Sequence, residues 1–201
     1  NNTLTGDENQ VLGSMNNIDG ALNLITGDNN VVTGLENEIE GNSNELVGNI
    51  NSITGERNII SGMENEIFGI SNSIEGNLNF ISGSDNIVSS FESVVFGNNN
   101  SIVGDNNTIG SSVAGYNEND IRGVWNNING NNNTVEGDYN SISGNTNSIV
   151  GNGNNIIGDD NLIQGDRNMI EGNANQILGD DNSIIGDNRE IDGNNISIGT
   201  Q

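Results

Sequence analysis

The side chains that could take part in chemistry are almost all carboxylates, amides and hydroxyls. The chain of 201 residues contains 28 Asp and Glu but no His and no Cys. A pair of carboxylates can act as general acid and base only when burial separates their pKa values, and these are spread over turns and outward positions. The Ser and Thr hydroxyls have no histidine to activate them as nucleophiles. We therefore expect no catalytic residues and no enzyme.

The charge excludes further classes of function. Four Lys and Arg against 28 acids give a net charge of −24. A nucleic-acid binder needs a cationic surface, so we expect no nucleic-acid partner. The same sign disfavours anionic lipid, and no apolar run approaches the ~20 residues that span a bilayer, so we expect no membrane insertion.

A seven-residue repeat, x-x-Asn-x-Ile-x-Gly, runs through the chain. An aliphatic residue recurs at every seventh position from Val11 to Ile109 and again from Ile121 to Ile191. One apolar position per heptad, with a Gly in almost every unit, is incompatible with a coiled coil. The x-Ile-x alternation is typical of a very short strand, and Asn and Gly tolerate the positive φ of turns.

These units must stack, because strands this short cannot bury a core alone. A 28-residue super-repeat divides evenly into coils of two units but not of three. We therefore predict an all-β, two-sided flattened β-solenoid of 14-residue coils, forming a single domain over 1–201. Aliphatic residues from the two sides fill a thin core, and the Asn side chains form ladders at the corners. The register breaks at about 111–119, which predicts one shortened coil or a small bulge loop.

Acidic and amide residues also recur at the corners. Two columns are expected there: Asp138, Asn152, Asp166 and Asp180 on one side, and Asn145, Asp159, Asn173 and Asp187 on the other. These are either solvated turn residues or weak surface calcium sites, since calcium prefers several oxygen ligands. The calcium-binding nonapeptide repeat is absent, so we assign no metal site and no cofactor. Arg167 is expected beside Asp181.

Short side chains recur on the outward positions of the predicted strands. They are either ordinary exposed strand residues or a flat face that orders water and contacts ice. The tentative ice-binding residues are Thr26, Thr54, Ser82, Ser141, Ser143, Ser148, Val150, Ser183 and Ile185.

The repeat closely resembles the x-x-Asn-x-Val-x-Gly unit of the ice-recrystallisation-inhibition proteins of cold-tolerant grasses. Segments such as GNNNSIVGDNNTIG at 97–110 and GNNNTVEGDYNSISGNTNSIVG at 130–151 carry the match. The resemblance implies a left-handed β-roll that binds ice through Ser, Thr and Val on one face. This chain departs from that pattern in using Ile for Val and in placing Glu38, Glu40 and Glu66 on one face.

A looser resemblance to the head of trimeric autotransporter adhesins leaves an alternative function. An extracellular structural or adhesive solenoid would self-associate through the apolar outward residues of its first half. These residues are Leu24, Leu35, Ile50, Met63, Phe68, Leu78, Phe80, Phe91 and Phe96. For either function we expect a secreted, extracellular protein. If the protein binds ice, its partner is ice or ordered water.

Overall fold

The computed structural model describes residues 72–199 apart from 77–78, 91 and 111–117. Before residue 72 it describes ten stretches: 3–5, 10–12, 17–19, 24–26, 31–33, 38–40, 45–46, 52–53, 59–61 and 66–68. Between 45 and 68, and at the second residue of each earlier strand, only the backbone is described. The chain divides into two compact units, Asn1–Asn99 (unit 1) and Asn100–Gln201 (unit 2), and each is considered separately.

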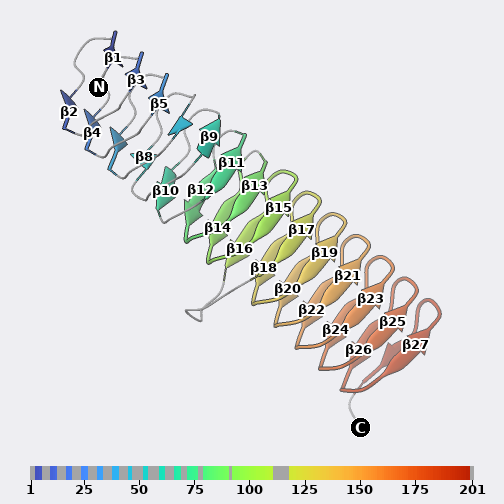
Figure 1. Ribbon diagram of the computed structural model, residues 1–201. Coiled ribbons are helices and arrows are strands. Elements are labelled where there is room, and N and C mark those ends of the chain that lie inside the picture. The colour runs from blue at the N-terminus through green and yellow to red at the C-terminus, as the bar shows by residue number, and fades with distance from the viewer. Residues whose placement is uncertain are drawn as a thin grey trace. The chain divides into compact units, whose positions relative to one another are not determined.

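All regular elements in the described residues are β-strands, and these residues contain no helix long and apolar enough to cross a membrane. In both units, alternate strands belong to two sheets, which we call sheet A (odd-numbered strands) and sheet B (even-numbered strands) (Figure 1).

In unit 1, sheet A contains β1 (Thr3–Leu4), β3 (Asn17–Ile18), β5 (Val31–Val32), β7 (Glu45–Leu46), β9 (Ile59–Ser61), β11 (Ser73–Glu75) and β13 (Ile87–Ser89). Sheet B contains β2 (Gln10–Val11), β4 (Leu24–Ile25), β6 (Glu38–Ile39), β8 (Ser52–Ile53), β10 (Glu66–Phe68), β12 (Phe80–Ser82) and β14 (Val94–Phe96).

In unit 2, sheet A contains β15 (Ser101–Val103), β17 (Asp120–Arg122), β19 (Thr134–Glu136), β21 (Ser148–Val150), β23 (Leu162–Gln164), β25 (Gln176–Leu178) and β27 (Glu190–Asp192). Sheet B contains β16 (Thr108–Gly110), β18 (Asn127–Asn129), β20 (Ser141–Ser143), β22 (Asn155–Ile157), β24 (Met169–Glu171), β26 (Ser183–Ile185) and β28 (Ser197–Ile198).

Neighbouring strands of each sheet pair in parallel with a step of 14 residues. In sheet B, for example, Ile142 pairs with Ile156 and Ile156 with Ile170. In sheet A, Ile149 pairs with Ile163. The chain therefore alternates between the sheets every seven residues. This confirms the predicted two-sided β-solenoid of 14-residue coils, whereas the extent of a single domain over 1–201 stays a prediction.

The coil that contains the register break is longer than the others. Asn119 donates its backbone N–H to Asn100 Oδ1 across 19 residues, while the equivalent bond elsewhere spans 14. The coil therefore has 19 − 14 = 5 additional residues, so of the two alternatives the shortened coil was wrong, while the small bulge loop stays a prediction. The chain still alternates between the two sheets across this coil, because Ile109 of sheet B is followed by Ile121 of sheet A. Residues 111–117 lie outside the described residues.

The aliphatic repeat position forms the core. Its members from Ile74 to Ile184 are all almost completely buried, while the residues on either side of each face outward. Full burial of an Ile contributes roughly 1.5–3 kcal/mol, which makes this column the main source of stability. The side chains at the earlier repeat positions lie outside the part that the structure describes.

The Asn position forms a continuous hydrogen-bonded ladder inside the corners. Asn140 donates its backbone N–H and its Nδ2 to Asn126 Oδ1, at 2.9 and 3.1 Å. Its Nδ2 also donates to the carbonyl of Gly151 at 2.9 Å, and its own Oδ1 accepts the N–H of Asn154 at 3.0 Å. Both ends of the buried amide are thus satisfied, which removes the cost of burying it.

Glycine follows most of the strands because the backbones of adjacent coils nearly touch there. Gly144 has φ of +151°, and a Cβ at this position would collide with the carbonyl oxygen of Gly158. A side chain at this point in the coil would push the rungs apart.

Candidate functional site

The outward positions of unit 2 form two faces with different chemistry. Each described three-residue strand contributes two outward side chains, one before and one after its buried residue. Because strands pair with a 14-residue step, equivalent positions of one sheet form straight columns. Each sheet therefore presents two parallel rows of side chains to solvent, about 4.8 Å apart along the row.

The outer face of sheet B in unit 2 is almost uncharged. Its first row consists of Thr108, Asn127, Ser141, Asn155, Met169, Ser183 and Ser197. Its second row consists of Gly110, Asn129, Ser143, Ile157, Glu171, Ile185 and Gly199. Among these described positions Glu171 is the single charged residue. It lies between Ile157 and Ile185 in its column.

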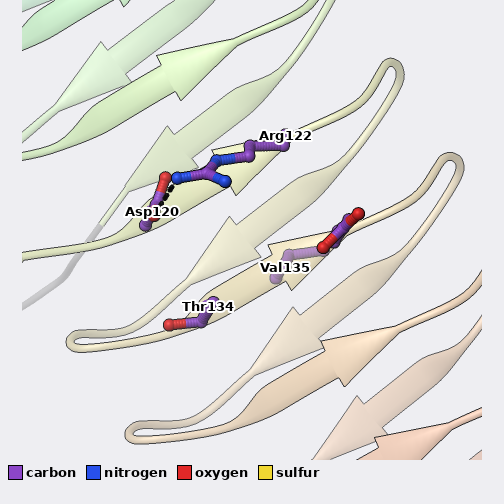
Figure 2. A pocket seen from close by; sticks show the side chains of 5 residues that line it. Asp120, Arg122, Thr134 and Val135 are labelled. Carbon is purple, nitrogen blue, oxygen red and sulfur yellow. Dashed lines mark hydrogen bonds and ion pairs between the residues drawn. The ribbon is translucent and has the colours of Figure 1, made fainter.

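The outer face of sheet A in unit 2 carries five charged residues: Asp120, Arg122, Glu136, Glu190 and Asp192. Asp120 and Arg122 lie with Thr134 around a hollow of about 70 Å³ between β17 and β19 (Figure 2). Arg122 Nη2 donates to Asp120 Oδ2 at 3.2 Å, and both side chains remain well exposed. Asp120 Oδ1 is buried and has no hydrogen-bond partner among the described residues. The other four charged residues of this face are exposed and therefore keep their own hydration.

The structure separates the residues predicted to contact ice. Ser141, Ser143, Ser183 and Ile185 lie together on sheet B of unit 2, on β20 and β26. Ser148 and Val150 lie on β21 of sheet A, so they face the other way and cannot contact the same flat surface. Thr26 is exposed beside β4 and Ser82 is half-buried on β12, both on sheet B of unit 1. Thr54 lies outside the described residues.

The outer face of sheet B in unit 1 mixes acids with large apolar side chains. Glu38 and Glu40 are exposed beside Leu24, as the sequence indicated. Phe80 and Phe96 contact each other, with ring centroids 5.5 Å apart and planes at 55°. Phe68 belongs to β10, where only the backbone is described, while Leu35, Ile50, Met63, Leu78 and Phe91 lie outside the described residues. The self-association predicted for these residues stays a prediction.

A second ladder on the outside of the corners was missed by sequence reasoning. Asn152 Oδ1 accepts the N–H of Asp138 at 2.7 Å, and Asp166 Oδ1 accepts the N–H of Asn152 at 2.7 Å. Each side chain here accepts from the preceding coil, whereas each buried Asn accepts from the following coil. The 14-residue recurrence of Asp and Asn after Gly was the available signal.

These corner carboxylates therefore have a structural role. No group of three or more acidic side chains among the described residues is arranged to hold a metal ion. Weak calcium binding at the corners stays a prediction.

The expected pair of Arg167 and Asp181 is present as a bidentate ion pair. Arg167 Nε donates to Asp181 Oδ1 at 2.7 Å and Nη2 donates to Oδ2 at 2.9 Å. The hydrogen bond from Arg167 lowers the pKa of Asp181, and the hydrogen bond to Asp181 raises the pKa of Arg167. Both groups are exposed, so the pair adds little to stability.

Comparisons with known proteins agree with this geometry. The grass antifreeze beta roll family matches residues 1–69, 58–144 and 113–201, which together span the chain. No curated protein matches it in sequence. The crystal structure of the polySia-specific acetyltransferase NeuO shares 13% sequence identity with this chain. The alignment covers 100% of this chain and 89% of that one, and the TM-score of 0.17 is too low to show a common fold. By its repeat, its two-sided coil and its match along the full length, this chain belongs to the grass antifreeze β-roll family and binds ice.

Proposed function

We propose that ice is bound by the outer face of sheet B in unit 2, from β16 to β28. The observation that carries this proposal is the distribution of charge. Among the outward positions of the described strands of unit 2, sheet B has one charged residue, Glu171, whereas sheet A has five.

Charge matters because ice binding requires water at the protein surface to take lattice positions. A carboxylate or guanidinium orients its hydration shell around itself, and removing that shell is costly. A long charged side chain also loses rotamer freedom when an ordered surface fixes it. Hydroxyl groups, by contrast, can share hydrogen bonds with ordered water, and aliphatic groups leave that water free to bond to its own neighbours.

The composition of the face supports the same choice. Ser141 and Ser143 flank one buried Ile, and Ser183 and Ile185 flank another, three strands further along the sheet. Ile157 is half exposed between Ser143 and Glu171 in the second row. The rows thus present hydroxyl, amide and methyl groups at one fixed spacing on a backbone held from inside by the Asn ladder.

A matched pair of substitutions tests the choice of face. Ser141 on sheet B and Ser148 on sheet A occupy the same position of the repeat, seven residues apart. Ser141→Arg is expected to reduce ice-recrystallisation inhibition and ice-affinity partitioning by about tenfold or more, because it adds a hydrated charge to the contact surface. Ser148→Arg is expected to leave both near the wild-type level.

The reverse result, or an equal loss in both variants, contradicts the assignment to sheet B. Circular dichroism and thermal unfolding of both variants show whether the fold is retained, since each side chain points away from the core. Full activity in both variants would place ice contact elsewhere on the molecule.

Family membership also supports an extracellular location and a role without catalysis. The protein would act by adsorbing to ice, and no chemical step is needed. Detection of the native protein in extracellular fluid tests the location, and its absence there contradicts it.

A further inference from the structure

We propose that one edge of unit 2 binds an uncharged, extended polysaccharide. The site consists of the residues at one repeated turn position, Trp125, Tyr139, Gly153 and Arg167, which we call the aromatic edge. This edge joins sheet A to sheet B, and it is distinct from the ice-binding face proposed above.

The four residues occupy equivalent places in successive coils. The backbone N–H of Tyr139 donates to Val124, that of Gly153 to Asp138 and that of Arg167 to Asn152, each a carbonyl 15 residues earlier. Trp125 makes the corresponding bond to Asp105 across the longer coil. The two aromatic side chains therefore leave the solenoid from adjacent rungs, about 4.8 Å apart.

Both aromatic residues lie where the fold does not favour them. Trp125 has φ of 59° and Tyr139 has φ of 60°, in the left-handed region that bulky residues rarely adopt. This conformation belongs to the repeat, because the equivalent turn residues of the other described coils also have φ near 60°. The two rings are 55% and 65% exposed, so they contribute little to the core, and exposed aromatic residues tend to mark binding sites rather than packing.

The surroundings select the ligand. Gly153 is exposed, and a Cβ there would meet only Arg167 Cγ, at 3.6 Å, so the edge is open beyond Tyr139. Arg167 is already paired with Asp181, so it brings no free positive charge. Acidic and amide side chains precede the edge residues in their turns, at Asp138 and Asn152.

Exposed aromatic rings on adjacent rungs, with polar side chains beside them, suit a sugar ring, which has an apolar C–H face and a rim of hydroxyls. The rung spacing is close to the length of one sugar unit in an extended chain, so Trp125 and Tyr139 can stack on consecutive units. The net charge of −24 disfavours polyanionic glycans and anionic lipid. A protein partner would need a larger apolar patch than two rings provide.

Trp125 is the single tryptophan of the chain, so its fluorescence reports directly on the site. Titration of the full chain with cellohexaose, an uncharged β-linked glucan, is expected to give a saturable change in tryptophan emission. The polyanion polygalacturonate is expected to give none. No saturable change with cellohexaose, or an equal response to both glycans, would overturn the proposal.

Substitution by Asn keeps the fold, because Asn132 and Asn188 adopt the same backbone conformation at equivalent turns. Tyr139→Asn is expected to weaken cellohexaose binding about tenfold through the loss of one stacking surface. Trp125→Asn is expected to weaken binding by a similar factor. Calorimetry measures binding by this variant, because it lacks the tryptophan that reports by fluorescence. The control is Thr146→Asn, an exposed residue with φ of 60° on the opposite edge, which should bind as the wild type does.

Binding that is unchanged in both Tyr139→Asn and Trp125→Asn contradicts a site on this edge, as does equal weakening by Thr146→Asn. All three variants are expected to retain ice activity, since no substituted side chain lies on the outer face of sheet B. The failure of the glycan site is therefore distinguishable from a failure of the assigned ice-binding face.

Discussion

The two outer faces of unit 2 differ sharply although the same scaffold supports both. On each sheet the middle residue of the described three-residue strands is buried or nearly so, and the buried Asn ladder runs beneath both at the corners. Outside, sheet A has charged residues on β17, β19 and β27 and uncharged residues on the other strands, while sheet B has mainly Ser, Asn and Ile around one Glu. The interior thus specifies the rungs, and the outward positions are free to encode function.

The largest effect is expected from breaking the scaffold that the faces share. Gly144→Ala places a methyl group against the Gly158 carbonyl and should lower the free energy of unfolding by about 3 kcal/mol or more. Gly110→Ala is the control, because a Cβ there has no neighbour within 4 Å. Chemical denaturation measures the difference. Similar stability of the two variants would show that the rungs are not in close contact at Gly144.

The next largest effect is the difference in stability lost when the inner or the outer amide ladder is broken. Asn140→Ala removes a buried amide and leaves Asn126 Oδ1 and the Gly151 carbonyl without a side-chain donor, at a cost of about 1–3 kcal/mol. Asn152→Ala removes an exposed amide whose partner, the Asp138 N–H, can bond to water, so its cost should stay below about 1 kcal/mol. Thermal unfolding of the pair tests this, and an equal loss contradicts the distinction.

A smaller effect should sharpen the contrast between faces. Glu171→Ser removes the one charge from the described outer positions of sheet B in unit 2 and should raise ice-recrystallisation inhibition about twofold to threefold, because the rows become continuous. Glu136→Ser makes the same change on sheet A, between Arg122 and Val150, and should leave activity unchanged. A gain in Glu136→Ser alone would reverse the assignment of the faces.

The smallest effect concerns the edge pair, which belongs to neither face. The pKa of Asp181 is lowered in the folded state by its hydrogen bond from Arg167. The contribution of the pair to stability is therefore present above the unfolded pKa of Asp and is lost as the pH falls through the lower, folded value. Titration of the Asp181 carboxyl by NMR should show this, with Arg167→Gln raising its pKa towards the ordinary value. An unchanged pKa in Arg167→Gln would show that the ion pair is absent in solution.

The sequence predicted the scaffold well because each repeat position has one physical task. Ile142 must fill the core and Asn140 must pair at a buried corner, so their types recur without much variation. The outward residues carry no such constraint. The ice-binding residues predicted from the sequence included both Ser148 and Ser141, yet a seven-residue step carries the chain to the other sheet. The 14-residue spacing of Trp125 and Tyr139 was likewise present in the sequence, but the exposure of both rings is visible only in the structure.

The 14-residue register has a consequence for how such a protein can change in length. Duplication of one full coil would add a row to both faces and leave every later side chain on its original side. Duplication of a single seven-residue unit would exchange the sides for everything downstream, carrying serines to where carboxylates had been. The five additional residues before Asp120 do not cause that exchange, because Ile109 of sheet B is still followed by Ile121 of sheet A. Growth by whole coils would therefore enlarge the adsorbing area in proportion to chain length.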